Sequence, residues 1–364
     1  MRVLHVAPFF EPAWERGGMA RAAAGLARAL AARGHEVTVV TTRPRGSPAE
    51  EIADGVRVLR WSSWPPFERR LVPWAPGLRR RIETLARGVD VGHVHGHRTG
   101  FATAASAAFA AAGAPYVLQP HGTYPAHGQR ALAKRMFDRL AGASVVARAA
   151  RLVAVSEAEA RDLPRPATVV PNGVELRGAS AARGARGQGL LFVGNDSRQK
   201  RGLQLVPLLA ALPEARLDVV GAFGEGFRRV FAPVAGRVTW SGVLAPAELA
   251  HAYARADLVI HPAVGEAFGL VPFEAALCGA DPVVAGDHGC GEWLRRAGGA
   301  TVPPDDPGAL LAAVKERLED HALRQREADA VARFAARELT WESAARRTEA
   351  LYADLLAARR RSVA

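Results

Sequence analysis

Two glutamates in the segment EAFGLVPFE, Glu266 and Glu274, stand eight positions apart with an apolar, glycine-containing turn between them. A buried strand precedes the segment, and a helix is expected to start near Leu270. The backbone amides from Phe268 to Val271 would then be helix-start donors without intrahelical partners, and such donors suit a phosphate group. Carboxylates bind phosphate poorly but accept hydrogen bonds from hydroxyls. The spacing therefore predicts a diphosphate with a hydroxyl-bearing group at each end, as in a nucleotide sugar.

Short apolar strands alternate with alanine-rich helical stretches along most of the chain. The first series of strands comprises RVLHVAPF, EVTVVTT, VDVGHVH, APYVLQPHG, RLVAVS and ATVVPNG. After the stretch LRGASAARGARGQG the alternation restarts with LLFVG, ARLDVVG, VTWSG, ADLVIHPA and DPVVAG. Such alternation predicts parallel sheets, and 364 residues exceed the usual size of one core. The expected fold is α/β, with two Rossmann-like doubly wound parallel-sheet domains facing each other across a cleft.

The glycine- and arginine-rich stretch sets the expected domain boundaries. An N-terminal domain is expected over residues 1–172, a linker over 173–188 and a C-terminal domain over 189–340. The terminal amphipathic helix, 341–364, is expected to pack back toward the N-terminal domain. Ligands of such sheets lie beyond the carboxyl ends of the strands, where EAFGLVPFE stands.

The charge balance is strongly basic, with 48 lysines and arginines, 36 acidic residues and a formal net charge of +12. Only three of the basic residues are lysines, so part of the excess reflects a compositional preference for arginine. Nucleic acid, an anionic membrane surface and phosphorylated small molecules are all compatible with this charge. Lys200 stands out because it follows the strand LLFVG, where a phosphate ligand is expected.

The number of cysteines and the apolar segments of the sequence indicate the cellular compartment. Cys278 and Cys290 form no CxxC pattern, which favours a reducing, cytoplasmic setting. The segment MRVLHVAPFFEPAWERGG lacks the apolar region of a signal peptide. The longest apolar run, GFATAASAAFAAAGAPYVLQP, is broken by glycine and proline and predicts a helix followed by a buried strand. A cytoplasmic protein is expected, with peripheral contact at the inner face of the membrane left open.

EAFGLVPFE resembles the E-x7-E motif of retaining glycosyltransferases with the GT-B fold, in particular family 4 (glycosyl transferases group 1). Four further segments resemble elements of that family in the same order: GGMARAAAGLARAL, QPHGTY, VVPNGVE and DVVGAFGEG. The resemblance implies transfer of a sugar from a UDP- or GDP-linked donor to a glycan, glycolipid or small-molecule acceptor held mainly by the N-terminal domain. Surface polysaccharide or glycoconjugate biosynthesis is the implied setting.

The resemblance also implies roles for individual residues. His121 would hydrogen-bond near the donor sugar, Glu266 would contact the sugar hydroxyls and Glu274 the ribose. Lys200 would neutralise the departing diphosphate, although Arg201 is an open alternative for the main cation. Asn195 stands where the family often has an arginine, so Arg198 or Arg201 is expected to supply the second charge. The other positions expected near the donor are Gly17, Gly18, Gly221, Phe268, Gly269, Leu270 and Val271.

A metal site is considered and not expected. The segment HVHGH places His93, His95 and His97 at alternate positions, so they share one face if the strand continues, and three histidines could ligate zinc. No cysteine lies nearby in sequence, and no D-x-D follows a strand. We therefore expect neither a metal nor another cofactor.

The segment 61–81 mixes Trp61, Trp64 and Trp74 with five arginines. This composition suits a membrane interface or a lipid-linked acceptor, and equally a surface insertion beside an acceptor site. Nearby cations that could extend the patch are Arg130, Lys134, Arg135 and Arg139.

Two rival functions stay open on the sequence. Another nucleotide-sugar enzyme of the same fold, such as an epimerase, would need additional acid/base carboxylates. A basic nucleic-acid-binding protein would gather cations on one face and bind with strong salt dependence.

Overall fold

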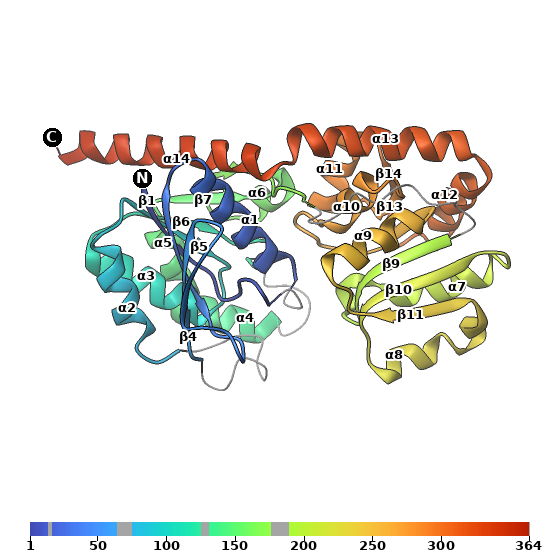
Figure 1. Ribbon diagram of the computed structural model, residues 1–364, viewed down its shortest axis with the longest axis horizontal. Coiled ribbons are helices and arrows are strands. Elements are labelled where there is room, and N and C mark those ends of the chain that lie inside the picture. The colour runs from blue at the N-terminus through green and yellow to red at the C-terminus, as the bar shows by residue number, and fades with distance from the viewer. Residues whose placement is uncertain (14–16, 64–74, 125–130, 176–188, 364) are drawn as a thin grey trace. The chain divides into compact units, whose positions relative to one another are not determined.

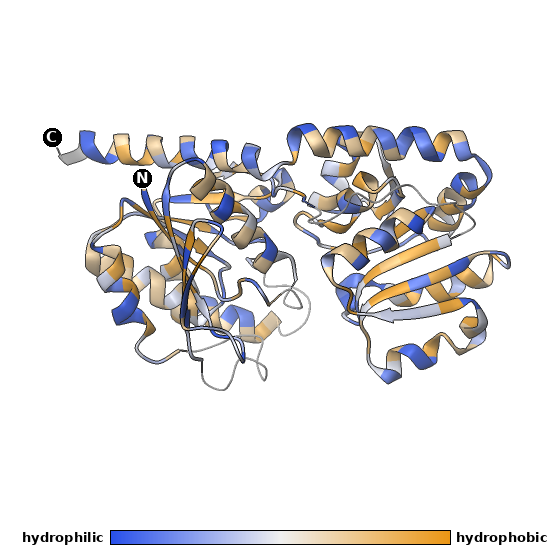
Figure 2. Ribbon diagram, viewed as in Figure 1, coloured by the Kyte–Doolittle hydropathy of each residue, from blue (hydrophilic) through white to orange (hydrophobic). Residues whose placement is uncertain are grey.

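The computed structural model describes residues 1–13, 17–63, 75–124, 131–175 and 189–363 (Figure 1). The chain forms two compact units, one made of Met1–Gly173 with Trp341–Ala364 and the other of Val174–Thr340. Most of the expected linker, from 176 to 188, lies outside the described residues. In Figure 2 the strands are mostly hydrophobic, whereas the helices show both hydrophilic and hydrophobic residues.

The first unit contains an eight-stranded sheet with the order β3-β4-β2-β1-β5-β6-β7-β8. All its neighbouring strands are parallel except β3 and β4, which form an antiparallel hairpin. The strands are β1 Arg2–Val6, β2 Glu36–Thr42, β3 Glu50–Ala53, β4 Val56–Trp61, β5 Val91–His95, β6 Tyr116–Gln119, β7 Arg151–Ala154 and β8 Ala167–Val169. The hairpin was not among the expected strands, although its turn, Asp54–Gly55, has the positive φ angles of 50° and 77° that favour an Asp-Gly pair.

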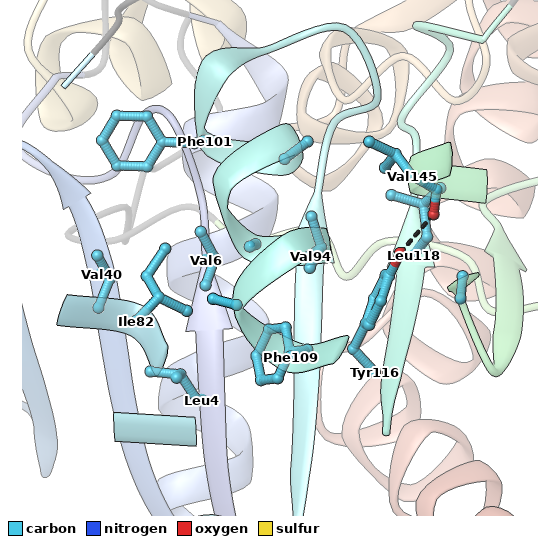
Figure 3. Close-up of a cluster of buried hydrophobic side chains, with 14 of the residues drawn as sticks. Leu4, Val6, Val40, Ile82, Val94, Phe101, Phe109, Tyr116, Leu118 and Val145 are labelled. Atoms are coloured by element: carbon cyan, nitrogen blue, oxygen red, sulfur yellow. Dashed lines mark hydrogen bonds between the residues drawn. The ribbon is translucent and has the colours of Figure 1, made fainter. Parts of the chain in front are cut away.

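Helices cover both faces of this sheet. They are α1 Gly18–Ala32, α2 Leu78–Ala86, α3 Gly100–Ala112, α4 Ala131–Phe137, the π-helical η3 Asp138–Gly142, α5 Ala143–Arg148, α6 Glu157–Asp162 and α14 Trp341–Val363. One core forms where α2, α3 and α5 pack on the sheet, and the other where α1 and α14 pack on the opposite face. Figure 3 shows the first core, in which Phe109 lies beside the strands and the Tyr116 hydroxyl donates to the carbonyl of Val145. Because helices cover both faces, the central strands are mostly buried along their length.

The second unit contains a six-stranded sheet with the order β11-β10-β9-β12-β13-β14, parallel throughout. Its strands are β9 Gly189–Asn195, β10 Arg216–Ala222, β11 Val238–Gly242, β12 Leu258–His261, β13 Asp281–Ala285 and β14 Ala300–Val302. Its helices are α7 Leu205–Ala210, α8 Glu225–Val230, α9 Pro246–Arg255, α10 Val271–Leu277, α11 Gly289–Ala297, α12 Pro307–Glu319 and α13 His321–Glu338, with 3-10 turns η4 Arg198–Lys200, η5 Gly202–Gln204 and η6 Ala232–Arg237. The sequence prediction of parallel, doubly wound α/β sheets is confirmed.

Strand order locates the place in each unit where a ligand is best accommodated. In the second sheet the order reverses between β9 and β12, and in the first between β1 and β5. Helices leave the sheet toward opposite faces at such a point, so a crevice opens beyond the carboxyl ends of the two strands. Only two residue pairs join β9 to β12, Leu190 with Leu258 and Leu191 with Val259. The carboxyl ends of these two strands are therefore free to carry functional side chains.

A buried ion pair anchors helix α13 at the amino-terminal end of β12, the end of the second sheet away from the crevice. Asp257, directly before β12, is 0% exposed, accepts from the Gly189 amide at 3.0 Å and pairs with Arg324 of α13 at 3.0 Å. A carboxylate in this position needs its cation, because burial removes the hydration that would otherwise stabilise the charge.

Replacing Arg324 with methionine is expected to lower the free energy of unfolding by about 3–5 kcal/mol, because Asp257 keeps its burial and loses its cation. Urea unfolding at neutral pH measures the change. Arg326→Met is the matched control, since Arg326 is exposed on the same helix. Equal losses in the two variants would contradict a role for the buried pair.

Candidate functional site

The central feature of the second unit is a charged cluster at the carboxyl ends of β9 and β12. Lys200 closes the turn that follows β9, and its Nζ contacts Oε1 of Glu266, in the loop that follows β12. The other oxygen of Glu266 lies 2.7 Å from Nε2 of His261, the last residue of β12. The side chains of Lys200 and Glu266 are 19% and 15% exposed, and that of His261 is 0% exposed. Two of the expected catalytic residues are thus brought together, with His261 as a third member that the sequence did not indicate.

Opposing effects determine the charge of Glu266. Burial alone would raise the pKa of its carboxyl group, but the positive charge of Lys200 and the contacts with His261 outweigh burial and hold this pKa below the ordinary value. The carboxylate is therefore ionised at neutral pH. It accepts hydrogen bonds and is not available as a proton donor.

Gly269 is required by both its backbone and its surroundings. Its φ is +73°, and a Cβ atom there would lie 2.9 Å from Oε2 of Glu266 and 2.6 Å from Sγ of Cys290. The Cys290 amide also donates to the carbonyl of Glu266 at 3.0 Å. The loop backbone can follow this path only with a glycine at 269.

The helix expected near Leu270 is confirmed, beginning at Val271. The amides of Phe273 and Glu274 donate to the carbonyl of Leu270. Within the described ranges, the amides of Gly269, Leu270 and Val271 donate to no protein acceptor. The side chain of Phe268 packs in the interior, with its ring centroid 5.5 Å from that of Phe273.

Glu274 lies inside the second unit, on α10. Its side chain is 0% exposed, and Oε2 accepts from the Tyr253 hydroxyl of α9 at 3.0 Å. Tyr253 is a partner that sequence reasoning missed, because it lies 21 residues away on another helix. The expected contact between Glu274 and a ribose stays a prediction.

The remaining cations of the expected site have different surroundings. Arg201, with a φ of +51°, donates to the carbonyl of Pro304 and pairs with Asp305. Arg198 is exposed. Between the two candidates for the main cation, the structure therefore places Lys200, and not Arg201, beside Glu266.

Local backbone structure accounts for Gly221, Asn195 and Gly17 of the expected site, and gives no reason for a glycine at 18. A Cβ at Gly221, whose φ is +133°, would lie 1.9 Å from the carbonyl oxygen of Gly194, so the two strands approach closely there. Asn195 is exposed and accepts from the Ser197 amide at 3.0 Å, closing the turn after β9. Gly17 precedes α1 with a φ of +84°, while added Cβ atoms at Gly17 and Gly18 would meet nothing within 4 Å.

In the first unit the corresponding place is lined by imidazoles. His121 follows β6 and has a φ of +54°. Its Nε2 lies 2.9 Å from Nδ1 of His95, whose Nε2 lies 2.9 Å from Nδ1 of His5. Burial lowers the pKa of His121 to about 3, so the ring is neutral at pH 7. His5 was missed because its contact depends on the pairing of β1 with β5, which places it beside His93.

The three histidines of HVHGH do not share one face. The strand ends at His95, and Gly96 has a φ of +78°. His97 is directed elsewhere, with Nε2 3.1 Å from the carbonyl of Gly142. The condition for a common face, a strand that continues to His97, is therefore not met.

The ligand atoms of His5, His93 and His95 do lie within 4.8 Å of one another. The rings of His93 and His95 are stacked, however, with an interplanar angle of 5° and 4.4 Å between their centroids. Nitrogen lone pairs lie in the ring planes, so stacked imidazoles do not direct them at one point, as a tetrahedral metal requires. This geometry does not favour a metal ion shared by the three rings.

Comparison with solved structures identifies the fold. Sucrose-phosphate synthase from Thermosynechococcus elongatus superimposes with a TM-score of 0.75 at 20% identity, covering 98% of this chain and 100% of that chain. HepE from Anabaena, solved in complex with UDP-glucose, gives a TM-score of 0.74 at 19% identity over 97% of this chain and 100% of that chain. Together with the strand order, these similarities assign the GT-B fold.

Sequence comparison identifies the family. Residues 16–177 match Glycosyltransferase Family 4, and residues 187–320 match Glycosyl transferases group 1. A D-inositol 3-phosphate glycosyltransferase of Kineococcus radiotolerans is 32% identical over 386 residues, covering 88% of this chain and 87% of that protein. A glycogen synthase of Mycobacterium tuberculosis is 29% identical over 402 residues, covering 99% and 95%. The chain belongs to the family 4 glycosyltransferases and is a glycosyltransferase, as the sequence resemblance implied.

Lys200→Met and Glu266→Gln are expected to be coupled in a double-mutant cycle by at least about 1 kcal/mol at neutral pH, because the pair is largely buried. The pKa of Glu266 is lowered by folding, so its contribution is present above the ordinary carboxyl pKa of 4.5 and is lost as the pH falls below that value. Urea unfolding at about pH 7 and about pH 3 measures both effects.

Arg229→Met with Glu225→Gln provides the matched control, an exposed pair on α8 whose side chains are 74% and 77% exposed. Its coupling should be close to zero at both pH values. A Lys200–Glu266 coupling that matches this control, or that grows in acid, would disprove the assigned charge state.

Proposed function

We propose that the protein is a retaining glycosyltransferase that moves a sugar from a UDP- or GDP-linked donor to a glycan, glycolipid or small-molecule acceptor. Surface polysaccharide or glycoconjugate biosynthesis is the proposed setting. The observation that carries the proposal is the contact between Lys200 and Glu266 where β9 and β12 end. The contact supports a site in which Lys200 would serve as the cation for a diphosphate and Glu266 as the acceptor for sugar hydroxyls.

The names of similar structures support a nucleoside diphosphate as the ligand. HepE is described with UDP and with UDP-glucose, and starch synthase IV of Arabidopsis thaliana with ADP. Relatives named for inositol 3-phosphate and for glycogen indicate that acceptors differ widely among similar proteins. Inositol phosphate and a glucan therefore belong in the first acceptor panel.

On donor binding, the ammonium group of Lys200 would turn from Glu266 to the diphosphate oxygens, a charge-assisted contact of the same kind. Glu266, still held by His261, would then accept from the sugar hydroxyls. The free amides before α10 and the buried Glu274 would contribute at the phosphate and ribose.

The transfer we propose is a same-face displacement. The acceptor oxygen forms the bond to the anomeric carbon as the bond from that carbon to the phosphate oxygen breaks. The acceptor proton passes to the departing phosphate, so no protein nucleophile is needed. Lys200, with Arg198 or Arg201, would stabilise the charge that develops on the leaving group. His121 would hydrogen-bond to the sugar.

We further propose that no metal ion is required, because these cations can neutralise the diphosphate. Full activity in the presence of EDTA would be consistent with this, and restoration of a lost activity by Mg²⁺ would contradict it.

An exposed apolar stripe on the first unit supports peripheral contact of a cytoplasmic protein with an anionic membrane surface. Leu132, Met136 and Leu140 are spaced four residues apart over α4 and η3, and they are 72%, 56% and 84% exposed. Residues at this spacing lie along one side of a helix. The stripe is interleaved with the cations Lys134, Arg135 and Arg139.

An apolar stripe edged by cations is suited to the boundary between anionic headgroups and acyl chains. In the tryptophan- and arginine-containing segment 61–81, residues 64–74 lie outside the described residues. Arg130 lies outside them as well. No helix among the described residues is long and apolar enough to cross a membrane.

A panel of UDP-, GDP- and ADP-sugars is expected to contain one donor that raises the melting temperature, by an amount equivalent to about 2.7 kcal/mol at 100 times its Kd. Lys200→Met should abolish the shift and lower kcat by about 10²–10³-fold, because a charge that stabilises the leaving group is removed. Arg229→Met, an exposed cation on α8, should leave both unchanged. Tight RNA binding without any nucleotide response would refute the proposal, and product analysis separates transfer from epimerisation.

Flotation with vesicles containing phosphatidylglycerol is expected to recover the wild-type protein, and vesicles of phosphatidylcholine alone should recover much less. A triple replacement of Leu132, Met136 and Leu140 by serine should weaken the interaction without changing the melting temperature, since these side chains are exposed. Unchanged flotation of this variant would place the membrane contact elsewhere.

A further inference from the structure

Three histidines of the first unit form one continuous hydrogen-bonded chain. Nδ1 of His5 lies 2.9 Å from Nε2 of His95, and Nδ1 of His95 lies 2.9 Å from Nε2 of His121. The three residues come from the carboxyl ends of the neighbouring strands β1 and β5 and from the turn after β6. His5 and His95 are 0% exposed. Water therefore does not compete for the bonds that link them.

The two ends of the chain are polar atoms without protein partners. Nε2 of His5 and Nδ1 of His121 are both buried and, within the part of the chain that the structure describes, form no hydrogen bond. Buried polar atoms are normally satisfied, so an unsatisfied one calls for an explanation, such as a bound water, an ion or a functional role. Here they are the first and last atoms of a single chain.

Because the three rings are neutral, the chain has only a few possible proton arrangements. Burial lowers the pKa of His5 and of His121 to about 3, and burial with the neighbouring imidazoles lowers that of His95 well below its ordinary value. At neutral pH each ring therefore has one N–H group and one lone pair. Each hydrogen bond of the chain needs an N–H group from one ring and a nitrogen lone pair from the next.

Only two proton arrangements satisfy both bonds. If His5 donates from Nδ1, then His95 must also carry its proton on Nδ1, and so must His121. If His121 donates from Nε2, all three rings carry the proton on Nε2. In the first arrangement Nδ1 of His121 is a hydrogen-bond donor, and in the second it is an acceptor.

We propose that His5 and His95 are positioning residues that determine, as a unit with His121, whether the free Nδ1 of His121 donates or accepts a hydrogen bond. His121 need not change its position for this, because the two arrangements hold the same number of protons and differ only in which nitrogen of each ring carries one. The link to a sugar hydroxyl rests on the proposed function, whereas the coupling of the three rings does not.

The backbone around His121 supports the need for this side chain. A φ of +54° is uncommon for a residue other than glycine, and histidine, like asparagine and aspartate, is one of the few side chains enriched there. The turn is held by Glu159 of α6, whose carboxylate accepts from the amide of Gly122 and, at 2.8 Å, from that of Val155. An imidazole at 121 is thus fixed through both its backbone and its ring.

His93 is an internal control, because it lies beside the hydrogen-bonded chain without belonging to it. It is equally buried and stacks on His95 at 4.4 Å between ring centroids. Its nitrogens bond outside the chain, however, with Nδ1 2.6 Å from the Tyr352 hydroxyl and Nε2 3.1 Å from Oε1 of Gln119. Loss of His93 removes a stacked ring and leaves both bonds of the chain in place.

The test is a long-range ¹H–¹⁵N spectrum of the full chain labelled with ¹⁵N-histidine, without ligand, in which nitrogen shifts report the tautomer of each ring. His5, His95 and His121 are expected to share one tautomer. His95→Leu should release His121 into the exchanging mixture of a free imidazole, whereas His93→Leu should not. Different tautomers among the three rings of the wild-type protein would overturn the proposal, even if the variants fail to fold.

Kinetics with the donor found in the panel test the consequence for transfer. His95→Leu should lower kcat by about tenfold, the effect of losing one hydrogen bond to a buried group, with KM for the donor unchanged. His95→Asn, which keeps a side chain with a hydrogen-bond donor and acceptor at this position, should restore part of the loss. If the spectra show coupled tautomers and no transfer is found, the proposed function fails while the coupling stands. Coupled tautomers with an unchanged kcat in a folded His95→Leu would limit the chain to a structural role and overturn its link to catalysis.

Discussion

A carboxylate held away from water must be compensated, and the second unit is arranged around one such requirement at Glu266. Its two oxygens meet Lys200 and His261, which come from the ends of β9 and β12 on either side of the strand-order reversal. Gly269 and Cys290 fix the loop that carries the carboxylate, because no side chain other than hydrogen fits at 269. Sheet topology therefore determines where the charges meet, and the charges hold the loops after both strands.

The two units place different chemistry at equivalent positions of their sheets. In the second, the strand-order reversal carries charged groups, Lys200 and Glu266. In the first it carries imidazoles that burial keeps neutral, His5 and His95, linked to His121. A cation with a carboxylate suits an anionic group that bears hydroxyls, and neutral rings suit uncharged polyols. This division supports a donor bound by the second unit and a hydroxyl-rich partner at the first.

Local patterns in the sequence predicted a large part of this arrangement. Alternating apolar strands and helices specify parallel sheets, and EAFGLVPFE specifies a strand, a glycine turn and a helix, so Glu266 and Lys200 could be placed at one edge. The contacts of His5 and Tyr253 could not be found in the same way, because they depend on which strands and helices are neighbours. The β3–β4 hairpin was missed although Asp54–Gly55 signals it, and the condition for a face shared with His97 is not met because the strand ends two residues earlier. Pairing between distant segments is the information that periodicity does not contain.

On the proposed function, the contact between Lys200 and Glu266 also provides a basis for selecting an intact donor. A ligand that takes Lys200 away from Glu266 leaves a largely buried carboxylate with His261 alone, which is unfavourable unless hydroxyl donors replace the ammonium group. Free phosphate offers the anion without those donors, and a free sugar offers the hydroxyls without a counter-charge for Lys200. A molecule that joins a phosphate group to a sugar, as a nucleotide sugar does, satisfies both residues together. The ion pair that stabilises the ligand-free site would thus favour the complete nucleotide sugar over either of its parts.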